Sequence, residues 1–301
     1  MQRLNSAHRR ESIVAYILLL PCLLGFLTFI LFPLIGSLLI SFTEWDFLKG
    51  FAGIKWVGFD NYKYLLSGQD EWFSKSAVNT IVFAAVTVPL GIILGMATAV
   101  LIHRYVYLPT VFKVVVFIPY ISSIIASSVV WMVVFQPSYG PVNNILTALG
   151  VENLPGWFTD IKWAFPTIMA FQIWQTLGYN VVVFLAGLKG IPNELYEAAT
   201  IDGASEWQKF RFVTIPMISP TTFFLSTMGF VASFKVFDSV KVLTGGGPGN
   251  VTTVIAFYIY REAFKFYRMG TADAAAWLMF ILIFAVTLIQ MRKQKDWVVY
   301  D

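Results

Sequence analysis

The chain has 301 residues, of which 57% are hydrophobic and 13% are charged, whereas roughly a quarter of the residues of ordinary soluble domains are charged. This composition excludes an ordinary soluble protein and predicts an integral membrane protein. The formal net charge of +4 comes from basic residues that flank the apolar runs, so nucleic acid is not expected as a partner.

Six apolar runs are long enough to cross a lipid bilayer, whose hydrocarbon core of about 30 Å needs about 20 residues of helix. They lack the alternation of β-barrel strands. The predicted fold is therefore all-α: a polytopic membrane protein with about six transmembrane helices in a single transmembrane domain, residues 1–301. The predicted spans are about 13–42, 78–102, 112–135, 163–188, 217–243 and 272–291.

Basic residues predict the orientation, because loops rich in lysine and arginine stay on the cytoplasmic side. With an even number of spans, four basic clusters fall on one side, and the opposite connections hold as many acids as bases. Both termini are therefore predicted to be cytoplasmic. The clusters are Arg3, Arg9 and Arg10; Arg104 and Lys113; Lys189, Lys209 and Arg211; and Arg292, Lys293 and Lys295.

The stretch EAATIDGASEWQKFRFVTIP, residues 197–216, is a polar interruption between the fourth and fifth spans. Gly203 is expected to end a first short helix, and Ser205 with Gln208 matches a capping box that begins a second. Pro216 is expected to end that second helix. From composition alone, a solvated amphipathic connector and a docking surface are equally open interpretations.

The same stretch resembles the EAA loop of binding-protein-dependent ABC importers, within a coupling loop of residues 189–216. Glu197, Ala198, Ala199, Gly203 and Pro216 occupy the positions of that pattern, with isoleucine in place of the leucine before the proline. In that family the loop forms coupling helices that dock on the cytoplasmic ATPase subunit. The resemblance thus implies ATPase-coupling roles for Glu197, Ala198, Ala199, Asp202, Gly203, Arg211 and Pro216.

Four further segments resemble the permease subunits of carbohydrate ABC importers of the maltose, glycerol-3-phosphate and multiple-sugar type. They are GFDNYKYLL (58–66), NTIVF (79–83), FIPYISSIIASSVVW (117–131) and FDSVKVLTGGGPGNVTTV (237–254). The resemblance implies a type I importer in a bacterial or archaeal cell membrane. It also implies four kinds of partner: a second homologous permease subunit, two ATPase subunits that hold ATP and magnesium, an extracytoplasmic solute-binding protein and a carbohydrate substrate. It implies no cofactor on this chain.

Polar side chains within the spans are candidates for the substrate path, because they are costly in hydrocarbon. The sequence gives Gln172, Gln175, Thr176, Tyr179 and Asn180 in span four, and Ser233, Lys235 and Asp238 in span five; the resemblance adds Gly229. Lys235 and Asp238 are three residues apart, so they could form a structural pair on one helix face or contact the substrate.

No catalytic or metal site is expected. His8 and His103 are far apart in sequence, and TGGGPGN lacks the Lys-Ser/Thr of a phosphate-binding loop. The chain is therefore expected not to be an enzyme. Two competing classes remain: an ion-coupled secondary transporter of small polar solutes, and a membrane assembly or signalling subunit that transports nothing.

Overall fold

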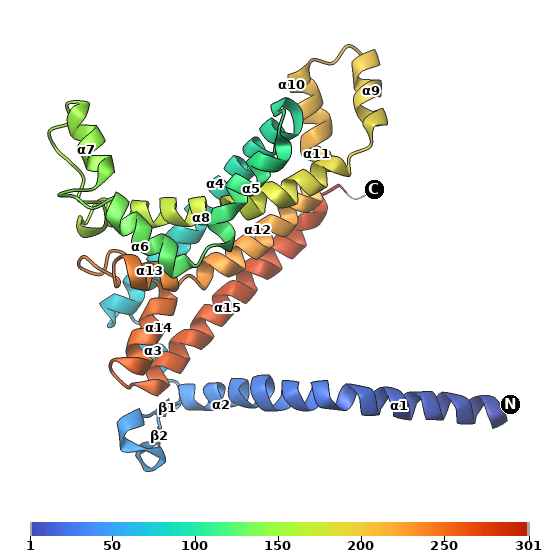
Figure 1. Cartoon of the computed structure of the whole chain (residues 1–301). Helices are drawn as coiled ribbons and strands as arrows, with labels where there is room; N and C mark the ends of the chain where they lie inside the picture. The colour runs from blue at the N-terminus through green and yellow to red at the C-terminus, as the bar shows by residue number, and fades with distance from the viewer. Residues whose placement is uncertain (1, 300–301) are drawn as a thin grey trace.

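The structure of the chain is a computed structural model that describes residues 2–299, with the side chains of residues 2–10, 12, 13 and 105 left undescribed. The N-terminal arginines and His8 therefore lie outside the described side chains. The longer helices are α1 (Gln2–Phe26), α2 (Phe32–Ser41), α4 (Glu71–Tyr105), α5 (Pro109–Ile121), α6 (Ile124–Val134), α8 (Ala164–Lys189), α12 (Ser219–Phe234), α14 (Ile255–Phe264) and α15 (Met269–Lys293) (Figure 1).

Shorter elements connect these helices at the two ends of the molecule. They are α3 (Asp60–Leu66), α7 (Pro141–Ala148), α9 (Asn193–Ile201), α10 (Glu206–Lys209), α11 (Ile215–Met217), α13 (Asp238–Leu243), β1 (Thr43–Glu44) and β2 (Lys55–Trp56). The two strands form an antiparallel ribbon. The all-α polytopic fold predicted from the sequence is confirmed.

Four helices are long and apolar enough to cross a membrane, and two bent helix pairs raise the possible number of crossings to six. The bent pairs are α5 with α6, at 98°, and the α10–α11 segment with α12, at 60°. The four unbroken candidates are Val14–Ser41, Glu71–Arg104, Ala164–Lys189 and Met269–Asp296.

The predicted span 112–135 is not one helix, because α5 stops at Ile121 and α6 starts at Ile124. Pro119 lies in the last turn of α5, where it has no N–H to continue the helical ladder, and the two residues after Ile121 are extended. The side-chain amide of Gln175 on α8 donates hydrogen bonds to the carbonyl oxygens of Pro119, at 2.8 Å, and Ser122, at 3.3 Å. A side chain of α8 thus donates hydrogen bonds to the carbonyl groups that have no helical partner at the break between α5 and α6.

The predicted span 217–243 is also interrupted. Helix α12 ends at Phe234, and α13 begins at Asp238 and packs against α6. Because α12 ends at Phe234, Lys235 and Asp238 do not lie on one continuous helix. At the opposite end, the 60° bend leaves Pro220 in the first turn of α12, where a missing N–H has no cost.

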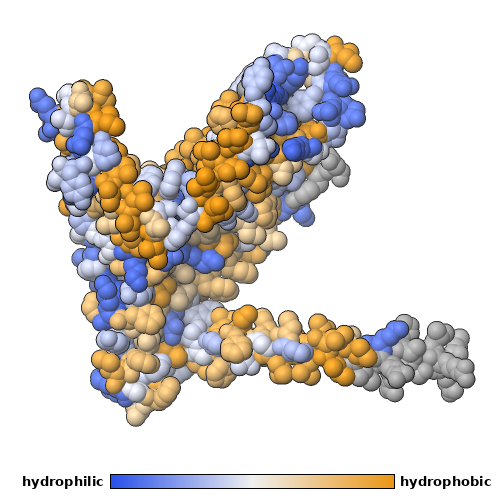
Figure 2. Space-filling view, in the orientation of Figure 1, coloured by the Kyte–Doolittle hydropathy of each residue, from blue (hydrophilic) through white to orange (hydrophobic). Residues whose placement is uncertain are grey.

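Helices α1 and α2 form one rod that extends away from the other helices (Figure 1). A π-helical turn, Leu27–Leu31, joins them. No residue of the most apolar window of this span is buried, and Figure 2 shows the rod covered mainly by hydrophobic residues. Near its inner end the indole N–H of Trp277 on α15 donates to the hydroxyl of Ser37 at 3.2 Å. Such an apolar surface suits lipid or another membrane subunit.

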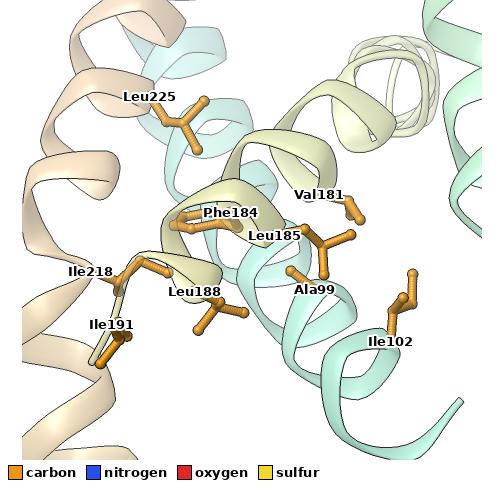
Figure 3. Close-up of a cluster of buried hydrophobic side chains, with 9 residues drawn as sticks. All are labelled: Ala99, Ile102, Val181, Phe184, Leu185, Leu188, Ile191, Ile218 and Leu225. Carbon is orange, nitrogen blue, oxygen red and sulfur yellow. The ribbon is translucent and has the colours of Figure 1, made fainter. Parts of the chain in front are cut away.

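Helix α8 is the centre of the packing. Its buried residues meet α4 and α12 in an apolar cluster (Figure 3) that comprises Ala99, Ile102, Val181, Phe184, Leu185, Leu188, Ile191, Ile218 and Leu225. Small residues permit the close approach: a Cβ on Gly95 would lie 2.6 Å from Cβ of Asn180, and a Cβ on Gly178 would lie 2.3 Å from the carbonyl oxygen of Val116.

Asparagine side chains fasten the loops at the opposite end from α9. The amide of Asn79 on α4 donates to the carbonyl oxygens of Val251, at 3.0 Å, and Thr253, at 2.9 Å. The side-chain amide of Asn61 on α3 donates to the carbonyl oxygen of Thr43 at 2.9 Å. The loop backbone is therefore hydrogen-bonded to helices that lie far away in the sequence.

A buried ionic cluster joins α14 to the start of α15. The carboxylate of Glu262 is fully buried, pairs with Arg268 and lies 3.4 Å from Arg261. Burial raises the pKa of the Glu262 carboxyl, and the two guanidinium groups oppose that rise. The guanidinium of Arg261 also lies 3.5 Å from the centre of the Trp72 ring, so the start of α4 is held in the same cluster.

We predict that Gly178→Ala destabilises the chain, because the new methyl group would meet backbone atoms of α5 that cannot move independently. Adding an atom to a packed interior costs about 1–3 kcal/mol. The measurement is the midpoint of thermal unfolding in detergent. Gly36→Ala is the matched control, since nothing lies within 4 Å of its new Cβ. Equal midpoints for the two variants would contradict the close α5–α8 contact.

Candidate functional site

A cavity of about 550 Å³ lies between α4, α5, α8 and α12. Figure 2 shows hydrophilic residues at the base of the notch between the arm that ends in α7 and the arm that ends in α10. The cavity is lined by Thr87, Val88, Ile92, Tyr120, Gln172, Thr176, Tyr179, Asn180, Phe224, Leu225, Met228, Gly229, Val231, Ala232, Ser233 and Lys235.

Most of the substrate-path residues named from the sequence lie together in this cavity. They are Gln172, Thr176, Tyr179 and Asn180 on α8, and Gly229, Ser233 and Lys235 on or directly after α12. The wall therefore offers amides, hydroxyls and one ammonium group against an apolar background. Contact of these residues with a substrate stays a prediction.

The lining residues that the sequence analysis did not name include two with a hydroxyl group, Tyr120 and Thr87. Tyr120 on α5 stacks on Tyr179, with ring centres 5.0 Å apart and an angle of 23° between the planes. Thr87 on α4 lies 3.4 Å, hydroxyl to hydroxyl, from Ser233. Tyr120 belongs to the segment FIPYISS, which the sequence analysis did quote, whereas a threonine in the apolar run of α4 gave no signal.

Gln175 and Asp238 do not line the cavity. Gln175 is buried and directed at the break between α5 and α6, which gives it a structural role. Asp238 is exposed at the start of α13, and no ion pair within 4.0 Å joins it to Lys235 among the described residues. The possible pairing on one helix face is therefore wrong, because the helix does not continue from one residue to the other.

Gly229 has a packing role as well as a place on the wall. A Cβ at this position would lie 3.1 Å from a methyl carbon of Val88 on α4. The glycine therefore lets α12 approach α4 closely at the level of the cavity.

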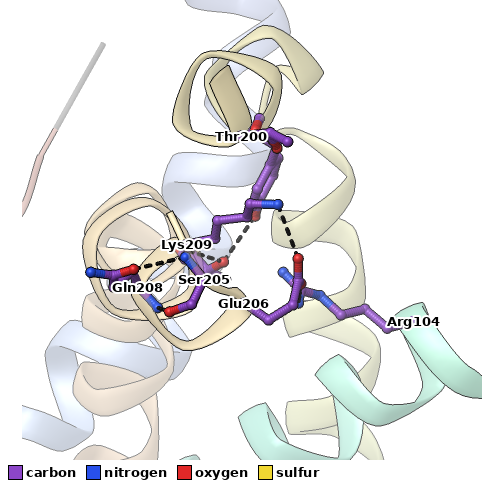
Figure 4. A network of polar contacts seen from close by, with 8 residues as sticks. Arg104, Thr200, Ser205, Glu206, Gln208 and Lys209 are labelled. Carbon is purple, nitrogen blue, oxygen red and sulfur yellow. Dashed lines mark hydrogen bonds and ion pairs between the residues drawn. The ribbon is translucent and has the colours of Figure 1, made fainter. Parts of the chain in front are cut away.

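The polar interruption is helix, turn and helix, as predicted. Gly203 has a φ of +77°, a conformation suited to glycine, and its N–H donates to the carbonyl of Thr200 at 3.0 Å. The capping box is confirmed: the N–H of Ser205 donates to the side chain of Gln208 at 2.7 Å, and the N–H of Gln208 donates back at 3.4 Å (Figure 4). Pro216 does not end the helix, because α11 continues through Met217.

An ion-pair network fastens this segment to α4 (Figure 4). The guanidinium of Arg104, in the last turn of α4, donates to Glu206 at 2.6 Å, and the ammonium of Lys209 donates to the other carboxylate oxygen at 3.0 Å. The side chains of Arg104 and Lys209 are mostly buried, whereas Glu206 is exposed. The first turn of α10 therefore moves with the end of α4.

The outer surface of the segment is apolar at several points. Ile201 is 87% exposed, Trp207 is 69% exposed and Phe212 is 71% exposed. Of the residues assigned to coupling, Glu197, Ala198, Asp202, Gly203 and Arg211 are exposed, while Ala199 and Pro216 are partly buried. Large exposed apolar residues beside small ones are typical of a surface that binds another protein.

The described side chains include no group of three or more His, Cys, Asp or Glu residues that could hold a metal ion. The expectation of no metal site stays a prediction.

The profile of the family described as "Binding-protein-dependent transport system inner membrane component" matches residues 87–295. The chain is 34% identical to the trehalose/maltose transport system permease protein MalF of Thermococcus litoralis, over 94% of each chain. It is 31% identical to the probable ABC transporter permease protein YesP of Bacillus subtilis, over 97% of this chain and 94% of the relative.

Solved structures agree. One chain of a bacterial ABC transporter involved in the import of the acidic polysaccharide alginate matches with a TM-score of 0.84 and 27% identity, over 98% of this chain and 99% of that one. A second structure of an alginate ABC transporter, in complex with a periplasmic protein that holds an alginate pentasaccharide, matches with a TM-score of 0.83.

The overall fold is thus shared with chains of ABC transporters over nearly the whole chain. The resemblance seen in the EAA stretch and in the four further segments is confirmed. The chain belongs to the family of binding-protein-dependent transport system inner membrane components, and it is a permease subunit of an ABC importer.

Proposed function

We propose that this chain and a second homologous permease together form the path for a carbohydrate, which crosses at the cavity between α4, α5, α8 and α12. The lining carries the proposal, because it combines neutral amides and hydroxyls with a stacked tyrosine pair. Such groups exchange hydrogen bonds with sugar hydroxyls, while aromatic faces pack on the apolar faces of sugar rings. The relatives named for trehalose, maltose and alginate support a carbohydrate.

An extracytoplasmic solute-binding protein delivers the carbohydrate to the end of the molecule that carries α7 and the loop of residues 244–254. The similarity to a transporter solved with its periplasmic protein supports this partner. Loops held to rigid helices, as the Asn79 amide holds residues 251–253, suit a docking surface.

One of two ATPase subunits binds α9, α10 and α11 on the cytoplasmic side, and the ATPase subunits hold the ATP and magnesium. This chain supplies no catalytic residue and no cofactor. The exposed Ile201, Trp207 and Phe212 support a protein partner at this surface. The basic residues that flank the apolar runs support cytoplasmic termini in the membrane of a bacterial or archaeal cell.

Movement of the ATPase subunits reaches the cavity by two routes. Glu206 joins α10 to Arg104 on α4, and the chain runs from α11 into α12 through the bend at Ile218. Both α4 and α12 line the cavity. A displacement of the coupling segment therefore changes the relative position of two cavity walls.

The ion-coupled carrier considered from the sequence is not supported, because the chain belongs to a family of binding-protein-dependent systems. The assembly or signalling subunit has no counterpart among the relatives described above, which are transport permeases.

We predict that Gly203→Pro abolishes the stimulation of ATP hydrolysis by substrate-loaded binding protein in the reconstituted complex. Proline cannot adopt the positive φ of this turn and cannot donate the hydrogen bond to Thr200. Gly203→Asn is the matched control, since asparagine tolerates the left-handed conformation. Stimulated hydrolysis in the proline variant would remove the coupling role from this turn, and transport with no ATPase present would overturn the importer.

A double-mutant cycle tests the link between α10 and α4. Arg104→Gln and Glu206→Gln are each expected to lower stimulated ATP hydrolysis, by at most about five-fold, because exposed ion pairs contribute little. The double variant should be no worse than Glu206→Gln alone, because that change already removes the contact with Arg104 as well as the one with Lys209. Losses that multiply in the double variant would show that the two side chains act independently.

A further inference from the structure

Lys235 is the single charged residue among the described residues that line the cavity. It directly follows the last residue of α12, and its side chain is exposed. The other polar lining groups are neutral amides and hydroxyls, such as Gln172 and Ser233. The wall that this chain contributes is therefore positively charged.

Among the described residues, no acidic side chain lies within 4.0 Å of that ammonium group. Asp238, the nearest acid in the sequence, lies beyond the break between α12 and α13, and the described part of the chain shows no ion pair between it and Lys235. Glu262, the other acid of residues 217–268, is buried and paired with Arg268.

The segment that contains Lys235 is rich in basic residues. Residues 217–268 contain two acids, Asp238 and Glu262, and five basic residues, Lys235, Lys241, Arg261, Lys265 and Arg268. Arg261 and Arg268 face the buried Glu262, whereas the Lys241 ammonium lies 4.3 Å from the centre of the Tyr260 ring, so an aromatic face rather than a carboxylate meets it.

We propose that the transported sugar carries an acidic group, a carboxylate or a sulfonate, and that Lys235 binds it. This inference rests on the proposed carbohydrate import and narrows its substrate class. An exposed ammonium group in the cavity wall attracts an anionic group, and a neutral sugar does not supply one. An acidic sugar supplies the counter-charge when it enters, while neutral lining groups such as the Gln172 amide bind its hydroxyls.

Lysine also suits release. Its ammonium is a flexible point charge, unlike the arginine fork that holds a carboxylate by two parallel hydrogen bonds. A single mobile contact lets the sugar leave the cavity once the walls move apart.

The test uses the complete complex with its binding protein in proteoliposomes. The probes are oligosaccharides from a mixed plant and algal polysaccharide hydrolysate, separated by anion exchange into a neutral and an acidic fraction. Stimulated ATP hydrolysis and uptake are measured for each. Carbodiimide-mediated reduction of the acidic fraction converts carboxylates into neutral alcohols and leaves sulfonates unchanged, which distinguishes the two acids.

The expected result is stimulation by the acidic fraction alone. In Lys235→Gln the concentration of acidic sugar needed for half-maximal uptake should rise roughly ten-fold, which is typical of losing a charged hydrogen bond. Lys235→Arg should keep most of the activity. Lys241→Gln is the matched control, because that lysine does not line the cavity.

Other outcomes separate the two proposals. Uptake of the neutral fraction alone, or a Lys235→Gln variant that transports acidic sugar as well as wild type, overturns the acidic substrate and leaves carbohydrate import standing. Stimulation by neither fraction, in a complex whose basal ATP hydrolysis is intact, overturns carbohydrate import and the acidic substrate with it.

Discussion

Every backbone polar group in hydrocarbon needs a partner within the protein, and this constraint decides how the cavity is built. A continuous helix satisfies it alone, whereas the break between α5 and α6 leaves carbonyl groups free. Gln175 supplies their partner from α8. The break can therefore exist only where α8 passes, and the same passage places Tyr120 of α5 against Tyr179 of α8. The hydrogen bonds of Gln175 and the stacking of Tyr120 on Tyr179 therefore both depend on the contact between α5 and α8.

Helix α8 meets a different neighbour on each of its faces. Gly178 lies against the backbone of α5, Asn180 fills the space beside Gly95 on α4, and Thr176 faces the cavity. Close contact on two faces fixes the rotation of the helix, because any turn about its axis would drive a side chain into a neighbouring backbone. The polar side chains of the third face are thereby held toward the cavity.

The sequence predicts those features that depend on residues close together in the chain. Ser205 and Gln208 are three residues apart, so their capping box is visible in the sequence, and the length of each apolar run predicts a span. Gln172 and Gln175 show the limit: both are glutamines on one helix, yet one lines the cavity and the other pairs with α5. The two glutamines differ in role only because α5 lies beside Gln175 and the cavity lies beside Gln172. The supposed pair of Lys235 and Asp238 failed for a related reason, since i, i+3 spacing brings side chains together only while the helix continues.

Helix α4 explains how a polar segment at one end of the molecule can act on a cavity well inside it. Its 35 residues extend about 50 Å, at about 1.5 Å of rise per residue. One end is capped by Asp70, which the hydroxyl of Tyr258 also binds at 2.6 Å, and the other end is held by Glu206 through Arg104. Thr87 and Val88 lie on the cavity between these two fixed ends. Pro89 follows Val88 directly and removes one hydrogen bond of the helical ladder, so α4 is weakened at the level of the cavity. In the proposed importer, a displacement of the coupling segment therefore reaches the cavity as a tilt of α4, a bend at Pro89, or both.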